Sequence, residues 1–428
     1  MKKNLVKTFI VGSIILAGSL VSCSSGTGNA IDATVKPLAS KAYKYLGQQS
    51  STEVMYYSGI MFCLRDEARA YIGKKALDAN GDGTVTLAEL HKSGAIWGHM
   101  SSTSSSGTVY PNYDLYNNGY TLGFKTQSEY DALSDSDKAK AVIGVDQGTY
   151  PDSIDSLFTG KLDVVCGFMD TRYGSAYVQA DSKYKGNDNL FLNTYTVAIT
   201  DPIMNDTVSV RSDLSTEKKE AIKTAFKAVV KQGNKSTEGT GAYLLYQIYS
   251  HTGYIDAADS DYDTAREMYE WTRDHSNKSE RSAKSVSHVI PTAVTAPENV
   301  EDNTISIELV PSNDPTTLAT RAKALEPLLD AAVNNQFNFS LTVGTAEGGY
   351  ELVTQALVSG TIDAAFLPAA SYAQATELNP GKVGVLLSAS RAGYKVQADD
   401  FPGFDDAAKA LQIKAMNGQI DADGNAIA

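Results

Sequence analysis

The chain has 428 residues, of which 42% are hydrophobic and 20% charged, and a formal net charge of −13. This length leaves room for two or three globular domains of about 150 residues each. The acidic balance argues against a nucleic-acid partner and against charge-driven adhesion to an anionic membrane face, although local donors can still bind an anion.

The first 48 residues predict a secretory leader and a tether. Three lysines precede residue 8, and an apolar stretch at 9–21 is too short to span a membrane comfortably. The stretch ends in LVSC and resembles the lipobox of bacterial lipoproteins. We expect a signal peptide at 1–22, lipidation of Cys23, a tether at 23–48, and anchoring to the extracytoplasmic face of the cell membrane. An ordinary signal peptide with a chance cysteine is the alternative.

Residues 49–200 form the next unit, and Cys63 and Cys166 lie in two of its apolar runs, which are typical of buried strands. Free, buried thiols are the expected state of these cysteines. A disulfide stays open as an alternative, because an extracytoplasmic compartment permits one.

Residues 78–89 (DANGDGTVTLAE) match the calcium loop of an EF-hand and follow a helical pattern at 67–77. Oxygen-bearing residues recur at loop positions 1, 3, 5, 7, 9 and 12, with glycine at position 6 for the sharp turn. One such loop favours a structural Ca²⁺ site over a sensor, and an acidic turn that binds nothing is the alternative. The predicted ligands are Asp78, Asn80, Asp82, Thr84, Thr86 and Glu89.

Residues 101–111 (SSTSSSGTVYP) lie between a predicted strand at 94–100 and a predicted helix. The first turn of a helix has unpaired backbone N–H groups and the positive end of the helix dipole. With serine hydroxyls added, this pattern predicts a cradle for a phosphate-like oxyanion. A flexible Ser/Gly loop is the alternative.

The second half predicts further α/β structure. Residues 201–274 contain strands and a capped amphipathic helix, and 275–303 are polar, lack periodicity and read as a linker. Strands and helices alternate over 304–400, which predicts a parallel sheet covered on both faces, and 401–428 form a tail near the hinge. The runs LFTGKLDVVCGFMDTRY and LVSGTIDAAFLPAASY share one pattern. We therefore expect two similar lobes with a ligand cleft between them.

The runs ISIELVPSNDPTTLATRAKALEPLLDAAV and YELVTQALVSGTIDAAFLPAASYAQA resemble the first lobe of periplasmic phosphonate/phosphite/phosphate-type solute-binding proteins of ABC importers. The stretch SSTSSSGTVYP resembles their Ser-Thr-Ser-Gly loop, and ITDPIMNDTVSVRSDLSTEKKEAIKTAF resembles their return strand and helix. The resemblance implies a two-lobed α/β fold of type II-like binding proteins, with hinge-linked lobes. Here the ISIELVPS half comes last, which implies a circular permutation or, alternatively, lobes swapped between two chains.

The resemblance also implies the ligand contacts. The serine loop would hold phosphoryl oxygens, two tyrosines would face the ligand from the other lobe, and Tyr150 stands where the family often has a histidine. Two aspartates lie where acidic residues contact the ligand's amine or its protonated oxygens. The implied ligand-binding residues are Ser104, Ser105, Ser106, Gly107, Tyr150, Asp170, Asp201, Tyr350 and Tyr372.

The leading hypothesis is a lipid-anchored solute-binding protein that captures a small phosphorus-containing anion and delivers it to an ABC permease. The second hypothesis is a calcium-dependent surface lipoprotein with an adhesion or partner-binding role. An enzyme is the weakest reading, because the sequence has no Ser–His–Asp order, zinc-ligand spacing or Walker loop.

Overall fold

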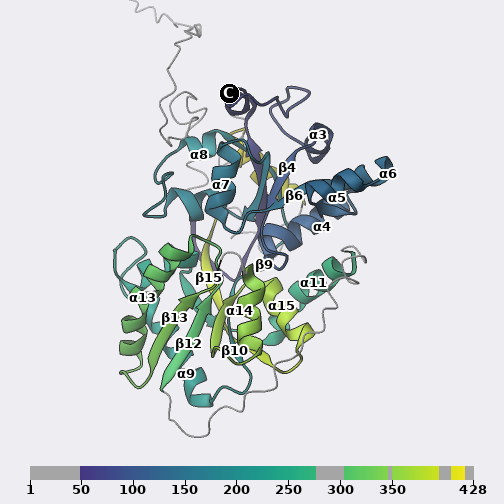
Figure 1. The fold of residues 1–428 in the computed structure, drawn as a ribbon. Helices are drawn as coiled ribbons and strands as arrows, with labels where there is room; N and C mark the ends of the chain where they lie inside the picture. Colours follow the sequence, from purple (N-terminus) through teal and green to yellow (C-terminus); the bar gives the residue numbers. More distant parts are fainter. Residues whose placement is uncertain (1–48, 276–302, 346–348, 395–405, 420–428) are drawn as a thin grey trace, which may run out of the picture.

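The computed structural model describes residues 49–275, 303–345, 349–394 and 406–419. The predicted signal peptide and the lipidation site at Cys23 lie outside these residues. The described chain forms two lobes, one above the other in Figure 1, each with a sheet and helices. This confirms the predicted α/β fold. Within these ranges, none of the helices combines the length and the apolarity that a membrane span requires.

The first lobe contains a six-stranded sheet in the order β5-β6-β4-β7-β3-β8. Its strands are β3 (Gly59–Leu64), β4 (Ile96–His99), β5 (Gly123–Lys125), β6 (Ala141–Asp146), β7 (Val164–Phe168) and β8 (Thr194–Ile199). Its helices are α2 (Asp66–Tyr71), α3 (Leu87–Ser93), α4 (Tyr110–Asn117), α5 (Gln127–Ala132), α6 (Asp135–Lys138), α7 (Tyr150–Phe158), α8 (Asn189–Leu192) and α17 (Asp406–Met416), with π-helical turns η1 (Ser105–Val109) and η2 (Tyr173–Tyr177).

The second lobe contains a seven-stranded sheet in the order β1-β15-β10-β14-β12-β13, with β11 also paired to β15. Its strands are β1 (Gln49–Val54), β10 (Thr207–Arg211), β11 (Gly253–Asp256), β12 (Thr304–Leu309), β13 (Asn338–Val343), β14 (Ala364–Leu367) and β15 (Val383–Tyr394). Its helices are α9 (Thr216–Val229), α10 (Gly241–Tyr249), α11 (Asp263–His275), α13 (Pro315–Ala332), α14 (Gly349–Val358) and α15 (Ala369–Leu378), with the 3₁₀ turn η3 (Asp259–Tyr262).

The two sheets share one strand pattern. In the first lobe β4 lies between β6 and β7, parallel to both, and β3 continues the sheet antiparallel to β7 and β8. In the second lobe β12 lies between β13 and β14, parallel to both, and β10 continues the sheet antiparallel to β14 and β15. Parallel strands of this kind bring their carboxyl ends to one edge, where α/β proteins bind ligands. In both lobes that edge faces the junction with the other lobe, as Figure 1 shows.

Two strands cross between the lobes side by side. The chain passes through β2 (Tyr56–Tyr57) into the first lobe and returns through β9 (Ile203–Met204), and these two strands pair with each other. A paired crossing is a short element on which one lobe can rotate against the other.

Two predicted elements differ in the structure. The helix predicted at 67–77 is α2, which ends at Tyr71, because the chain turns back at Gly73 with φ +74° and the amide of Leu77 donates to Asp66. Residues 49–54, predicted with the first lobe, form β1 and pair with β15 of the second-lobe sheet. Both strands of the predicted buried thiols are confirmed, and Cys63 and Cys166 are free and buried.

The segment predicted as a tail near the hinge contains a helix of the first lobe. Residues 406–416 form α17, which packs against β8 of the first lobe. The Asn417 side chain accepts from the Thr196 amide at 2.7 Å and donates to the Thr196 carbonyl at 2.9 Å. It thereby supplies hydrogen bonds to the edge strand β8, and Arg65 donates to the Asn417 carbonyl at 2.8 Å.

A fully buried ion pair fixes the segment after β7. Arg172 and Asp170 have side chains with 0% exposure and approach to 2.7 Å. Arg172 also donates to the hydroxyls of Thr194 and Thr196 on β8. A buried charge pair of this kind is costly to break, because the remaining partner is left charged and unpaired.

We therefore expect Asp170→Ala to lower the free energy of unfolding by about 3–5 kcal/mol, measured by urea denaturation. The control is Asp213→Ala, whose side chain is 79% exposed and pairs with Arg211 at 2.8 Å. This surface pair is expected to contribute no more than about 1 kcal/mol. Equal losses for the two variants would contradict a structural role for Asp170.

Candidate functional site

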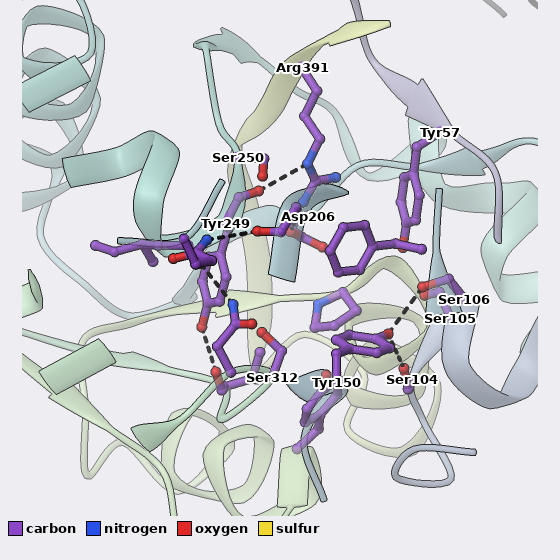
Figure 2. A pocket seen from close by; sticks show the side chains of 18 residues that line it. Tyr57, Ser104, Ser105, Ser106, Tyr150, Asp206, Tyr249, Ser250, Ser312 and Arg391 are labelled. Carbon is purple, nitrogen blue, oxygen red and sulfur yellow. Dashed lines mark hydrogen bonds and ion pairs between the residues drawn. The ribbon is translucent and has the colours of Figure 1, made fainter. Parts of the chain in front are cut away.

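A cavity lies between the two lobes at the carboxyl ends of their parallel strands (Figure 2). The space open to water-sized molecules is about 50 Å³. That holds roughly three to five waters, which is comparable with one tetrahedral oxyanion. The cavity is lined by Tyr57, Ser104, Ser105, Ser106, Tyr150, Phe168, Gly174, Gln179, Asp206, Ile248, Tyr249, Ser250, Val310, Ser312, Asn313, Tyr350, Pro368 and Arg391.

The serine loop (residues 101–107) enters the cavity at the start of a helix. Ser104 is the N-cap of η1, which continues directly into α4, and its hydroxyl accepts from the Gly107 amide at 3.3 Å. The amides of Ser105 and Ser106 lie in the first turn, where N–H groups have no partner within the helix. Hydroxyls and first-turn amides therefore gather at one point and favour negative charge there.

Gly107 has a packing role rather than a cavity-facing one. A Cβ at this position would lie 2.4 Å from Met100 Cγ, closer than packed carbons approach. Glycine is thus required for the start of the helix to pack against Met100, which follows β4. Gly107 is buried but does not line the cavity.

The serine loop is held by the second lobe as well as by its own. The Ser105 hydroxyl accepts from the amide of Ala370 at the start of α15, at 2.9 Å. Ser371 of α15 donates to the Thr103 carbonyl at 3.2 Å. Glu351 of α14 accepts from Ser101 at 2.7 Å and from Ser102 at 2.6 Å. The structure therefore shows the lobes closed on each other.

Tyrosine hydroxyls complete the wall opposite the serines. In Figure 2 the Tyr150 hydroxyl points at Ser104 and Ser106, 3.3 and 3.2 Å away. The ring of Tyr150 packs edge-on against Phe168 with centroids 5.0 Å apart. Burial raises the pKa of Tyr150, Tyr57 and Tyr350. These hydroxyls therefore stay protonated and act as neutral hydrogen-bond donors.

Arg391 of β15 brings a positive charge to the cavity, and Asp206 largely compensates it. The guanidinium donates to Asp206 at 2.6 Å and to Asn205 at 2.5 Å, and lies 5.0 Å from the ring centroid of Tyr57. Burial opposes ionisation of Asp206, but Arg391 and a hydrogen bond from His251 outweigh it and hold the pKa of Asp206 below its usual range. Neutral donors, rather than excess charge, are what the cavity offers an anion.

His251 lies behind this ion pair. Its Nδ1 is 2.9 Å from the Tyr254 hydroxyl and its Nε2 is 3.2 Å from Asp206. Burial and the charge of Arg391 lower the pKa of His251 from 6.5 to about 4, against the effect of Asp206. The imidazole is therefore neutral near pH 7, with Nε2–H donating to Asp206 and Nδ1 accepting from Tyr254.

The structure brings together five of the nine predicted ligand residues: Ser104, Ser105, Ser106, Tyr150 and Tyr350 line the cavity. Besides Gly107, three others lie elsewhere. Asp170 is paired with Arg172 in the first-lobe core, and Asp201 is paired with Lys409 of α17. Tyr372 packs against Tyr262 and donates to Asp259 at 2.6 Å.

Sequence reasoning missed several lining residues. Ser312 and Asn313 follow β12 at its carboxyl end, so the rule for parallel strands could have identified them. Tyr57 reaches the cavity from the crossing strand β2, for which no motif in the sequence gives a signal. Asp206 and Arg391 are distant in sequence and follow no motif, and only their shared sheet brings them together.

The predicted calcium loop folds as a series of Asx turns. Asp78 accepts from the amides of Gly81 and Gly83 at 2.7 and 2.8 Å, and Glu89 accepts from Thr86 in a capping box of α3. In the described part of the chain, no three His, Cys, Asp or Glu side chains are grouped to hold a metal ion. Calcium binding by this loop stays a prediction.

The buried imidazole makes stability depend on pH. Below pH 6.5 the unfolded chain protonates His251 while the folded protein does not until about pH 4. As the pH is lowered from 6.5 to about 4, the free energy of unfolding is therefore expected to fall by up to about 3 kcal/mol. In urea denaturation at a series of pH values, His251→Gln should show a shallower dependence, and His91→Gln, on α3, should keep the original one. An unchanged slope in the His251 variant would contradict the assignment.

Part of this chain matches a known protein family. The solved structures similar to it include XAC2383 from Xanthomonas citri bound to chloride ion and XAC2383 from Xanthomonas citri bound to ATP. They share 14% and 13% identity, cover 53% and 54% of this chain and 70% and 71% of their own, with TM-scores of 0.36 and 0.35. No curated protein matches the chain. Residues 76–262, which contain the serine loop, match the family described as ABC transporter, phosphonate, periplasmic substrate-binding protein, a family of binding proteins that are not enzymes.

Proposed function

We propose that this protein is the lipid-anchored solute-binding component of an ABC importer and binds a phosphonate, phosphite, phosphate or phosphorylated compound between its lobes. One observation carries the proposal. Serine hydroxyls and first-turn amides of the helix beginning at Ser105 converge with the Tyr150 hydroxyl on one small cavity at the lobe junction. Converging neutral donors at a helix N-terminus suit a tetrahedral oxyanion.

Binding would proceed by capture and closure, without covalent chemistry. In an open form the oxyanion would first meet the serine loop of the first lobe. Closure about the β2–β9 pair would then bring Tyr350 of α14 against it and the Ala370 amide of α15 against the Ser105 hydroxyl. The ligand favours the closed form because only that form surrounds it with donors from both lobes.

The chain order supports a circular permutation as part of the proposal. Strands β12 to β15 come last in the sequence, yet β10, nearly a hundred residues before β12, lies between β14 and β15. Joining the family's original ends through the linker at 275–303 would give this order. Anchoring at Cys23 would hold the protein at the membrane beside its permease.

We also propose that the loop at 78–89 binds one structural Ca²⁺. The loop is fastened to the C-terminal segment, since Gln419 donates to the Gly83 carbonyl at 3.3 Å. A bound cation would replace the backbone donors that the carboxylates now use. It would stabilise the outer end of the first lobe rather than the cavity.

The serine loop assignment predicts a loss of affinity on substitution. Ser106→Ala and Ser104→Ala should each weaken binding of inorganic phosphate or methylphosphonate by about 10- to 150-fold in isothermal titration calorimetry, because each removes a hydrogen bond to a charged group. The control is Ser153→Ala, a buried serine of α7 whose hydroxyl donates to Thr149. Unchanged affinity in both cavity variants would refute the site.

The calcium loop predicts a calcium-dependent stability. At a Ca²⁺ concentration about a hundred times the dissociation constant, unfolding should require about 2.7 kcal/mol more than in the presence of a chelator. Asp78→Ala should abolish this difference, whereas Asp131→Ala, outside the loop on α5, should retain it. Thermal unfolding that ignores Ca²⁺ in the unmodified protein would show that the loop binds none.

A further inference from the structure

A second cavity adjoins the first at the lobe junction. It measures about 350 Å³ and is walled by α7 and residues 175–184 of the first lobe and by residues 313–321 of the second. Gln179 and Asn313 line both cavities. We call this second cavity the side chamber. Its volume falls within the range of about 300–1,000 Å³ that is usual for small-molecule sites, whereas the first cavity holds little more than one oxyanion.

Two buried polar atoms on residues that line the side chamber have no hydrogen-bond partner. They are Oδ1 of Asn313 and Oγ of Ser175, in residues with 8% and 3% exposure. The Asn313 amide is anchored on its other side, where Nδ2 donates to the Ile248 carbonyl at 3.2 Å. Buried polar atoms are nearly always hydrogen-bonded in folded proteins, so these two atoms, one from each lobe, point to a ligand that supplies the partners.

The charged groups of the side chamber are already paired. Asp155 pairs with Lys183 at 2.8 Å, and Asp181 pairs with Arg321 at 2.6 Å. The remaining carboxylate, Asp314, accepts from the Thr317 amide as the N-cap of α13. A charged substituent would therefore have to compete with groups that already interact with these charges. Among the neutral groups of the lining that can recognise a ligand are the Asn313 amide and the Ser175 hydroxyl.

Arg321 also holds the wall between the two cavities. Its Nη1 donates to Gln179 Oε1 at 2.6 Å, and Gln179 Nε2 donates to the Gly174 carbonyl at 2.8 Å. The Gln179 amide is therefore fixed in orientation from both ends. This leaves Asn313 as the shared wall residue with an open acceptor.

We infer that the ligand is a phosphate ester or phosphonate with an uncharged, hydroxylated organic substituent, and that this substituent occupies the side chamber. The inference rests on the proposed function and extends it to the substrate class. The oxyanion binds at the serine loop. Hydroxyls of the substituent donate to Asn313 Oδ1 and form a hydrogen bond with Ser175 Oγ. Hydroxyl donors satisfy both atoms without disturbing the ion pairs.

The test compares three probes in isothermal titration calorimetry: inorganic phosphate, glycerol phosphate and phosphoethanolamine. Glycerol phosphate should bind about tenfold more tightly than either of the others, because it alone adds neutral hydrogen bonds. Ser175→Ala should weaken glycerol phosphate by about tenfold and leave inorganic phosphate within about twofold. Ser182→Phe, which fills the chamber from its wall, should act in the same selective way, and thermal unfolding checks that both variants fold.

The outcomes separate the two proposals. If inorganic phosphate binds and Ser104→Ala weakens it, but glycerol phosphate gains nothing and the chamber variants change nothing, the side chamber inference is overturned and the proposed function stands. Tighter binding of phosphoethanolamine than of glycerol phosphate also overturns it, since the substituent is then cationic. If none of the three compounds binds, the proposed function itself fails and the inference with it.

Discussion

The closed arrangement depends on how the polar groups of the serine loop are satisfied. Three adjacent hydroxyls are buried at the lobe junction, and buried hydroxyls without partners destabilise a protein. Ser104 and Ser106 find Tyr150 within their own lobe, but Ser105 is bonded to the Ala370 amide of the other lobe. The loop is therefore fully satisfied only when the lobes meet. Ligand recognition and lobe closure use the same short segment.

The two lobes are built alike, and this explains where the cavity lies. In each sheet the parallel strands, four in the first lobe and three in the second, are followed by one antiparallel strand that continues from the crossing, β3 in the first lobe and β10 in the second. Because both sheets present the carboxyl ends of their parallel strands to the junction, residues after β4 and β7 face residues after β12 and β14. Hydroxyls and amides that are over two hundred residues apart in sequence thus share one wall.

Local chemistry was predictable from the sequence, and long-range pairing was not. The serine loop, Tyr150 and Tyr350 follow from a strand–turn–helix pattern and a family resemblance. Asp170 and Asp201 do not reach the cavity, because they form ion pairs with Arg172 and Lys409. A local sequence motif cannot predict such partners.

The position of Tyr372 in the motif also did not predict the direction in which its side chain points. Successive helix residues point about 100° apart, so Ser371 contacts Thr103 of the serine loop while Tyr372 turns to Asp259. Alternating strands and helices at 304–400 revealed the second sheet, but its central strand β10 belongs to a segment far earlier in the chain.

That strand order also affects biosynthesis. A ribosome making about 5–20 residues per second needs roughly 5–20 s to pass from Arg211 at the end of β10 to Thr304 at the start of β12. During that time the first lobe can complete its six strands, while β10 has neither neighbour and both its edges are open to other chains. A nascent chain of this protein therefore depends on protection of one short strand until translation reaches the last quarter of the message.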